Sequence, residues 1–301
     1  MYDLIIIGGG VAGYSAAMYA KRFGMNILVL SEVDGGTLTQ THLVENWPGI
    51  PSISGFDLGN AVAEHAKSIG AESRFGTVVS LKKEENMFYL QLEDGVELQA
   101  KSVLLATGTK HREMGLPSEQ KLRNRGVSYC ATCDGAFFKD KIVAMIGGSD
   151  SAVKESLLLA QYAKHVYIIY RGDTVRPEPI NRKRMEENPK IEVINNANVV
   201  EVLGETRVEG VRLDTGKTLE LQGVFIEIGR IPYSNLAQQI GVHLNEKNEV
   251  IINKYAETNI PGFFAAGDVT DSHFKQAIVA AAEGAHAASS AFDYIKSSVP
   301  A

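Results

Sequence analysis

The sequence has little cysteine, and it lacks the long apolar and basic segments that mark several classes of protein. Two of its 301 residues are cysteine, a usage typical of a reducing compartment. The longest apolar stretch, AIVAAAEGAHAASSAF, is interrupted by Glu283 and His286 and falls short of the ~20 residues that cross a bilayer. The first strand-like stretch, DLIIIGGG, is broken by glycine too early for a signal peptide. We therefore expect a cytoplasmic protein without a membrane span.

Positive charge is also in short supply. The chain has 30 Lys and Arg residues against 36 Asp and Glu, which gives a net charge of -6 and no basic run. This balance argues against nucleic acid or an anionic membrane as a main partner. The composition is 45% hydrophobic and 22% charged, as in a soluble globular protein. The length favours two domains over one.

Glycine is present in a pattern that indicates a dinucleotide site. An apolar strand, Leu4 to Ile7, runs into Gly8, Gly10 and Gly13, and a helical stretch and a second strand follow. In such a βαβ unit the first glycine permits the tight turn. The second glycine lets the backbone approach a pyrophosphate, and the third lets helix and strand pack closely. Glu32, near the end of the second strand, is a candidate partner for a ribose hydroxyl, although the preceding Ser31 is where we would place the acid.

A second copy of this unit begins at KIVAMIGGSDSAVKES. We expect a strand from Ile142 to Ile146, a helix from about Ser151 to Ala163 and a strand from Val166 to Tyr170. The hairpins downstream of the two units also correspond, since each pairs two strands across a turn containing Asp and Gly. The segment after GRIPYSN is too short for a domain of its own and is expected to return to the first unit. The sequence thus predicts an α/β protein of two three-layer, Rossmann-like dinucleotide-binding domains, the second inserted into the first.

The two cysteines, Cys130 and Cys133, form a C-x-x-C pair followed directly by Asp134. A zinc site needs two further ligands, and no second cysteine pair or H-x3-5-H motif supplies them. A disulfide that closes so short a loop would stabilise little, and two buried inert thiols remain an alternative. The loop is rich in Ser, Thr, Gly and Asp, and the spacing suits thiol–disulfide exchange. We favour a redox pair with Asp134 as acid and base; the alternative role of Asp134 is helix capping.

These motifs resemble the low-molecular-weight, flavin-dependent thioredoxin reductases over nearly the whole chain. The resemblance rests on GGGVAG, VENWPG, LLATGT, YCATCDGAFF, FFAAGDV and KQAIVAAAEGAHAA, in the order and spacing of that family. It implies an FAD-binding domain formed by residues 1–110 and 237–301. It also implies an NAD(P)-binding-like domain, residues 111–236, that carries the redox-active pair. KHRE near residue 110 and GRIPY near residue 230 would be the hinges, with Lys110, His111 and Arg112 expected as a solvated basic surface.

The resemblance also implies roles for individual residues. Cys133 would be the sulfur nearer the flavin, Cys130 would attack the substrate disulfide, and Asp134 would transfer the proton. FAD would be bound by the first glycine turn, by residues around the flavin and by the start of the C-terminal helix, namely Gly8, Gly10, Gly13, Glu32, Gly36, Thr37, Asn46, Thr107, Gly108, Gly267, Asp268, Lys275, Gln276 and Ala277. The nicotinamide dinucleotide would be bound by the second turn and the loop after its second strand, namely Gly147, Ser149, Ala152, Arg171 and Arg176.

Two departures from the family pattern concern the electron donor. The second turn has Ser149 where the family has glycine, which places a Cβ where backbone should approach a pyrophosphate. The family's H-R-R-x-x-x-R grip on the NADPH 2′-phosphate is here YRGDTVR, so Gly172 replaces one arginine. The loss of one charge-assisted phosphate contact costs about 1.5–3 kcal/mol. NADPH stays the favoured donor, and ferredoxin is the alternative.

From the sequence we therefore predict a homodimeric FAD enzyme that reduces the disulfide of a thioredoxin-like protein, without a metal. Three alternatives stay open: the same enzyme fed by ferredoxin, a flavin oxidase that makes small-molecule disulfides, and a non-catalytic redox sensor built on the same scaffold.

Overall fold

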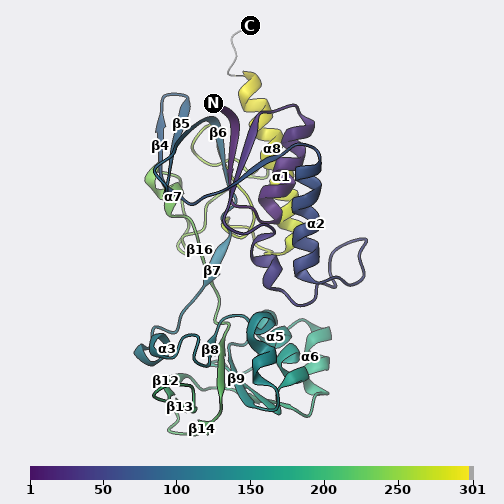
Figure 1. The fold of residues 1–301 in the computed structure, drawn as a ribbon, viewed down its shortest axis with the longest axis vertical. Helices are drawn as coiled ribbons and strands as arrows, with labels where there is room; N and C mark the ends of the chain where they lie inside the picture. Colours follow the sequence, from purple (N-terminus) through teal and green to yellow (C-terminus); the bar gives the residue numbers. More distant parts are fainter. Residues whose placement is uncertain (298–301) are drawn as a thin grey trace. The chain divides into compact units, whose positions relative to one another are not determined.

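The computed structural model describes residues 1–297 and divides the chain into two compact units (Figure 1). The first unit contains Met1–Lys110 together with the chain from Ile231 onward, and the second is His111–Arg230. Two short paired strands lie at the connections, β7 (Thr109–His111) and β16 (Arg230–Pro232). Within residues 1–297, none of the helices combines the length and hydrophobicity needed to cross a bilayer.

The first unit is built on a seven-stranded sheet of order β3-β2-β1-β6-β5-β4, with β17 also paired to β6. The pairs among β1, β2, β3, β6 and β17 are parallel, whereas β4, β5 and β6 form an antiparallel meander. The strands are β1 (Tyr2–Ile7), β2 (Ile27–Ser31), β3 (Glu72–Phe75), β4 (Val78–Glu84), β5 (Met87–Leu92), β6 (Glu97–Leu105) and β17 (Phe263–Ala265). The helices are α1 (Val11–Arg22), η1 (Gly36–Gln40), α2 (Gly55–Ser68), α7 (Asn235–Gln239) and α8 (Ala277–Ser297).

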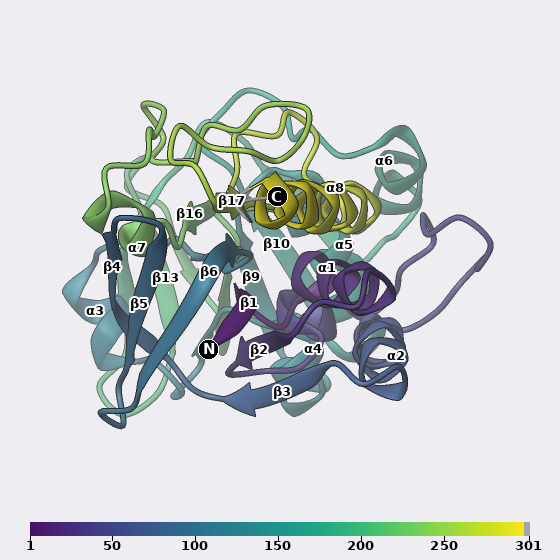
Figure 2. The ribbon, with the colours of Figure 1, turned by 90° about the horizontal axis from the view of Figure 1, so that it is seen from above.

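The continuous apolar run of β1 is explained by burial on both faces of the sheet. Leu4 and Ile6 belong to the core under helices α1 and α8, which Figure 2 shows side by side, whereas Ile5 and Ile7 belong to the core on the opposite face. The two helices approach at backbone distance, since a Cβ added to Gly284 of α8 would lie 2.1 Å from the carbonyl oxygen of Ala12. The small residues of the C-terminal helix therefore serve close packing on α1.

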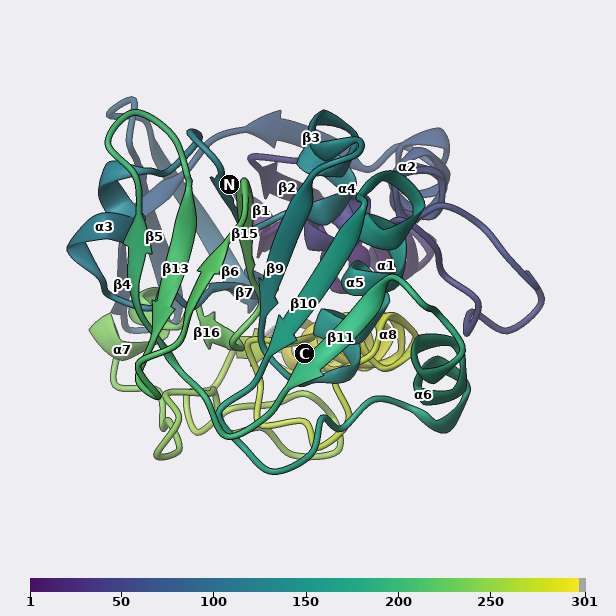
Figure 3. The ribbon, with the colours of Figure 1, turned by 90° about the horizontal axis from the view of Figure 1, so that it is seen from below.

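The second unit repeats this plan with a five-stranded, all-parallel sheet of order β11-β10-β9-β15-β8 (Figure 3). A three-stranded antiparallel sheet, β12-β13-β14, packs with it in one core. The strands are β8 (Val127–Ser128), β9 (Ile142–Ile146), β10 (His165–Ile169), β11 (Ile191–Ile194), β12 (Val199–Leu203), β13 (Gly210–Leu213), β14 (Thr218–Glu220) and β15 (Gly223–Ile226). The helices are α3 (Pro117–Lys121), α4 (Ala131–Asp134), η2 (Gly135–Phe138), α5 (Asp150–Tyr162) and α6 (Pro179–Glu186).

The predicted architecture is confirmed. Both βαβ units form, and the chain after the second unit returns to the first sheet, where β17 pairs with β6. The insertion of one domain into the other follows from this pairing. Strand β9 has the expected bounds, Ile142 to Ile146, whereas α5 and β10 each begin and end one residue earlier than expected.

Candidate functional site

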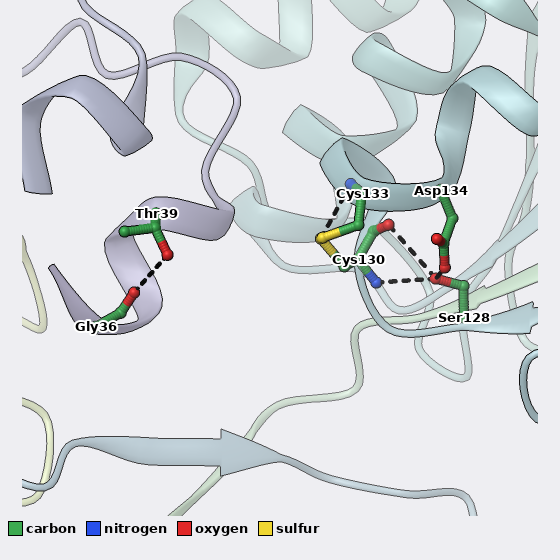
Figure 4. Close-up of a disulfide and its surroundings, with 6 residues drawn as sticks. All are labelled: Gly36, Thr39, Ser128, Cys130, Cys133 and Asp134. Carbon is green, nitrogen blue, oxygen red and sulfur yellow. Dashed lines mark hydrogen bonds between the residues drawn. A yellow bond between two sulfur atoms is a disulfide. The ribbon is translucent and has the colours of Figure 1, made fainter. Parts of the chain in front are cut away.

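The two cysteines are joined in a disulfide at the start of a single helical turn. Cys130 and Cys133 are bonded to each other with Cα atoms 5.3 Å apart. Cys130 is the N-cap of α4, and its Sγ accepts a hydrogen bond of 3.1 Å from the backbone N–H of Cys133 (Figure 4). Cys133 is exposed and Cys130 is half-buried. Once the pair is reduced, this N–H group and the positive end of the turn would stabilise negative charge on the Cys130 sulfur.

Asp134 is held beside the disulfide by Ser128, a residue outside the C-x-x-C-D motif. The Ser128 hydroxyl donates a hydrogen bond of 2.7 Å to Oδ2 of Asp134, and Ser128 Oγ accepts one of 3.1 Å from the backbone N–H of Cys130 (Figure 4). Ser128 ends β8, whose pairing with β15 fixes it in the sheet. The sequence shows a hydroxyl residue two positions before the first cysteine, but that it binds Asp134 becomes apparent only in the fold.

A partly buried polar cluster lies in the same unit and reaches the disulfide turn through Glu155 of α5. Glu155 accepts a hydrogen bond from the Ala131 backbone N–H, between the two cysteines in sequence. Burial first, and then the charge of Glu227, raise the pKa of Glu155 to about 8, while Arg230 opposes the shift. Glu227 itself is buried, with its Oε2 3.3 Å from Nδ1 of His111 and 3.5 Å from a guanidinium nitrogen of Arg230. The expected solvated surface at His111 is therefore wrong, because this side chain is only 19% exposed and faces a buried carboxylate.

The first glycine turn has the geometry that a bound pyrophosphate requires. Gly8 has a φ of +116°, and a Cβ there would lie 2.2 Å from the carbonyl oxygen of Ala106. A Cβ on Gly13 would lie 1.9 Å from the carbonyl oxygen of Gly8, so helix and strand could not pack this closely with any other residue. Gly10 is the N-cap of α1, and the nearest heavy atom to a Cβ built there is Gly36 Cα at 4.0 Å. The start of α1 is thus open to an anion.

The loop after β2 flanks this turn and is firmly anchored. The Gly35 N–H donates a hydrogen bond of 2.8 Å to the Gly9 carbonyl, and Gly36, with a φ of +59°, comes so close that a Cβ would lie 2.8 Å from Gly10 Cα. Thr37 follows within η1. In this turn the Thr39 hydroxyl donates a hydrogen bond of 2.8 Å to the Gly36 carbonyl (Figure 4). The loop is positioned next to the helix terminus by backbone contacts that leave no room for side chains.

Glu32 lines a cavity of about 390 Å³ next to this loop. Its Oε1 accepts a hydrogen bond of 2.8 Å from the Thr77 hydroxyl. Asp34, which also lines the cavity, is bound by the Tyr14 hydroxyl and the Lys67 ammonium, and hydrogen bonds to both groups help keep the pKa of Asp34 below its usual range against the effect of burial. A carboxylate at a cavity of this size fits the ribose end of a dinucleotide.

The remaining predicted flavin residues come from three separate segments of the first unit. Asn46 Nδ2 donates a hydrogen bond of 3.0 Å to Gln276 Oε1, which joins two predicted residues that lie 230 positions apart. The Thr107 hydroxyl donates a hydrogen bond of 2.8 Å to the Tyr233 carbonyl, and the next residue, Gly108, has a φ of +62°. Gly267 has a φ of +80° and is followed by Asp268, while Ala277 is the first residue of α8.

The ammonium group of Lys275 is bound by other residues of this chain. Its ammonium lies 2.9 Å from a carboxylate oxygen of Glu249 and donates hydrogen bonds to the carbonyls of Asp268 and Thr270. These contacts fasten the turn after β17, so the structure places Lys275 as a support of the predicted site.

The second glycine turn starts in the same way but has a side chain at the helix start. Gly147 has a φ of +144°, and a Cβ there would lie 2.1 Å from the Glu227 carbonyl. Ser149 is the N-cap of α5, and its Oγ accepts a hydrogen bond of 3.3 Å from the Ala152 N–H. Arg171 and Arg176 are exposed in the loop after β10.

Comparisons with known proteins agree with this geometry. The pyridine nucleotide-disulphide oxidoreductase family model matches residues 2–284. A thioredoxin reductase of Treponema pallidum is 40% identical, with 98% of this chain and 97% of that protein aligned. A crystal structure of Lactococcus lactis thioredoxin reductase has a TM-score of 0.95 at 36% identity, over 99% of this chain and all of that one. A ferredoxin-flavin thioredoxin reductase from Clostridium acetobutylicum has a TM-score of 0.55 at 30% identity, over 98% of each chain.

Some relatives are much longer than this chain. A Bacillus subtilis protein named NADH dehydrogenase is 36% identical over 98% of this chain, which spans only 58% of that protein. The thioredoxin reductases, in contrast, are matched over nearly their whole length. The chain belongs to the pyridine nucleotide-disulphide oxidoreductase family and, within it, to the low-molecular-weight thioredoxin reductases.

Proposed function

We propose that this chain is an FAD-dependent thioredoxin-disulfide reductase that takes its electrons from NADPH. The unit Met1–Lys110 with the chain from Ile231 would bind FAD, and the unit His111–Arg230 would bind the nicotinamide dinucleotide and carry the disulfide. The observation that carries the proposal is the Cys130–Cys133 disulfide, formed at a helical turn with an acid fixed next to it.

FAD fits the first unit because the residues there form a cradle for a dinucleotide. Gly10 leaves the start of α1 open for the pyrophosphate, and Glu32 lies at a cavity suited to a ribose. Asn46 and Gln276 form a hydrogen-bonded amide pair for the flavin end. Bound FAD would supply a pair of electrons to the disulfide, and the other steps belong to side chains of the protein.

The thiol chemistry follows from the helical turn. The Cys130 thiolate, stabilised by the Cys133 N–H, would attack one sulfur of the partner disulfide, form a mixed disulfide and release one partner thiolate. Cys133 would then attack Cys130, re-form the internal disulfide and release the second partner thiolate. The partner gains two electrons and the Cys130–Cys133 pair loses two, so the exchange balances. Asp134, held by Ser128, would deliver the proton to a leaving thiolate.

The partner is proposed to be a thioredoxin-like protein. Phe137, four residues after Cys133, is 72% exposed and offers an apolar contact next to the disulfide. We further propose that the protein is a homodimer, as predicted from the sequence. We also propose that it is cytoplasmic, because a reducing compartment keeps an exchangeable cysteine pair in its active dithiol form.

NADPH is supported by Arg171 and Arg176, two exposed cations in the loop after β10, which is where the second βαβ unit would bind the 2′-phosphate. A ferredoxin-fed enzyme is the second candidate. It is favoured by Ser149, because the hydroxyl of this residue accepts the hydrogen bond of the Ala152 N–H group, which is then not free to bind a dinucleotide phosphate.

An anaerobic titration of the flavin with NADPH, NADH and reduced ferredoxin separates these candidates. We expect NADPH to bleach the flavin and the electrons to reach added thioredoxin disulfide. Bleaching by ferredoxin alone would establish the second candidate. Oxygen uptake driven by a small dithiol would indicate a disulfide-forming oxidase, and a flavin that reduces no thioredoxin with any donor would indicate a sensor.

A further inference from the structure

The two glycine turns of this chain are built alike, so each serves as a reference for the other. Gly8 and Gly147 open the turns at positive φ, and their N–H groups bond to the ends of β2 and β10 at 2.8 and 3.0 Å. In the first turn the Gly35 N–H bonds to the Gly9 carbonyl at 2.8 Å. In the second the Arg176 N–H bonds to the Gly148 carbonyl at 2.7 Å. The positions of Gly10 and Ser149 therefore correspond.

The backbones of these two positions also agree. Gly10 has φ −82° and ψ −172° as the N-cap of α1, and Ser149 has φ −78° and ψ 173° as the N-cap of α5. Neither value requires glycine. The replacement therefore changes the surface that faces a ligand and leaves the path of the chain unchanged.

The two N-cap residues differ in whether a side chain binds the N–H groups at the start of the helix. Gly10 contributes no side chain and makes no side-chain cap, so no hydroxyl at this position accepts from the first N–H groups of α1. The hydroxyl of Ser149 accepts a bond from the Ala152 N–H, one of the donors that a pyrophosphate would use. A dinucleotide entering the second turn would have to displace this hydroxyl and accommodate its Cβ.

We propose that Ser149 is a specificity-determining residue of the second unit, which lowers the affinity of the enzyme for a pyridine dinucleotide by capping α5 with its own hydroxyl. This inference rests on the proposed function, in which the second unit binds the nicotinamide donor. The loss of one charge-assisted hydrogen bond to the phosphate corresponds to a dissociation constant about tenfold larger, or more.

The test is the binding of NADP⁺ to the oxidised, FAD-loaded protein, measured by titration calorimetry on Ser149→Gly and Ser149→Ala variants. Ser149→Gly removes both the hydroxyl and the Cβ, and we expect NADP⁺ to bind at least about tenfold more tightly than to the wild type. Ser149→Ala removes the hydroxyl alone, and we expect a smaller gain in affinity. Binding of oxidised ligand needs no turnover, so it is independent of the dithiol chemistry.

Ser54 provides a matched control in the first unit. It is the N-cap of α2, and its Oγ accepts a hydrogen bond of 3.0 Å from the Asp57 N–H. Ser54→Gly should leave NADP⁺ binding unchanged, while the absorbance spectrum of the bound flavin verifies that each variant is folded. The proposal is overturned if neither Ser149 variant binds NADP⁺ more tightly, or if Ser54→Gly gains as much. Failure of the proposed function would show differently, as NADP⁺ binding without transfer of electrons to thioredoxin.

Discussion

The hydrogen bond between Ser128 and Asp134 can be removed without changing Asp134 itself. This allows the positioning of the acid to be tested separately from its role in proton transfer. Ser128→Ala leaves both cysteines and Asp134 in place but removes the 2.7 Å hydrogen bond to the carboxylate and the acceptor of the Cys130 N–H. Ser128 is only 6% exposed, so the shape of the site limits replacement of its hydroxyl by water. We expect Asp134 to lose its fixed orientation toward the disulfide turn.

The size of the effect follows from the strength of the bond. The Ser128 hydroxyl donates to Asp134, so this bond strengthens as Asp134 gives up its proton and becomes a carboxylate. A hydrogen bond to an ionised carboxylate contributes about 1.5–3 kcal/mol, and about 1.4 kcal/mol corresponds to a tenfold change in rate. Electron transfer from the reduced dithiol to thioredoxin should therefore slow by about 10- to 100-fold if the bond is maintained through proton transfer. Reduction of the flavin by its donor should change little.

Stopped-flow mixing of the reduced protein with thioredoxin disulfide measures this step, and the rate is followed across the neutral pH range. Ser102→Ala is the matched control, since Ser102 is also buried and its hydroxyl donates a 2.7 Å bond to the Asp3 carbonyl in the other unit. A Ser128→Ala rate within twofold of the wild type, with an unchanged pH profile, would refute the positioning role.

Three further predictions concern the second unit. Glu155→Gln should increase stability at alkaline pH. In the wild type the folded state keeps a proton on Glu155 up to about pH 8, whereas the unfolded chain loses it near 4.5; stability therefore falls as pH rises between these values, by up to about tenfold in the folding constant per pH unit. Urea unfolding at both ends of this range tests the slope, and equal slopes in variant and wild type would contradict it. Gly172→Ala should destabilise the unit by about 1–3 kcal/mol, because its Cβ would lie 2.7 Å from the Tyr170 ring; thermal unfolding with and without Tyr170→Ala should show relief in the double variant, and additive losses would argue against the clash. Phe137→Ala should raise the KM for thioredoxin with little change in kcat, and an unchanged KM would exclude this side chain from the docking surface.

The sequence was sufficient to predict the architecture because the two βαβ units rest on local rules. Glycines at fixed spacing after an apolar strand specify a tight turn and close packing, and both units form as expected. The C-x-x-C-D block likewise specifies its own geometry, since the N-cap and the acid belong to one helical turn.

The surroundings of the disulfide could not be predicted in the same way. Glu155, Glu227, Arg230 and His111 come from distant segments and form a cluster only after the sheet is assembled. His111 was expected in solvent because a charged run in a loop gives no indication of a buried carboxylate elsewhere. The ion pair between Lys275 and Glu249 shows the same limit, since the two residues are far apart in the sequence and meet only in the folded chain.

The most direct test of the central claim is single-turnover electron transfer in Cys130→Ser and Cys133→Ser variants. Each FAD-loaded variant is reduced anaerobically and mixed with oxidised thioredoxin, and the free thiols formed on thioredoxin are counted. We predict that both variants bind FAD and that neither completes the reduction of thioredoxin, because each lacks one of the two sulfurs that exchange. Release of fully reduced thioredoxin by either variant at the wild-type rate would contradict the proposed route through this disulfide.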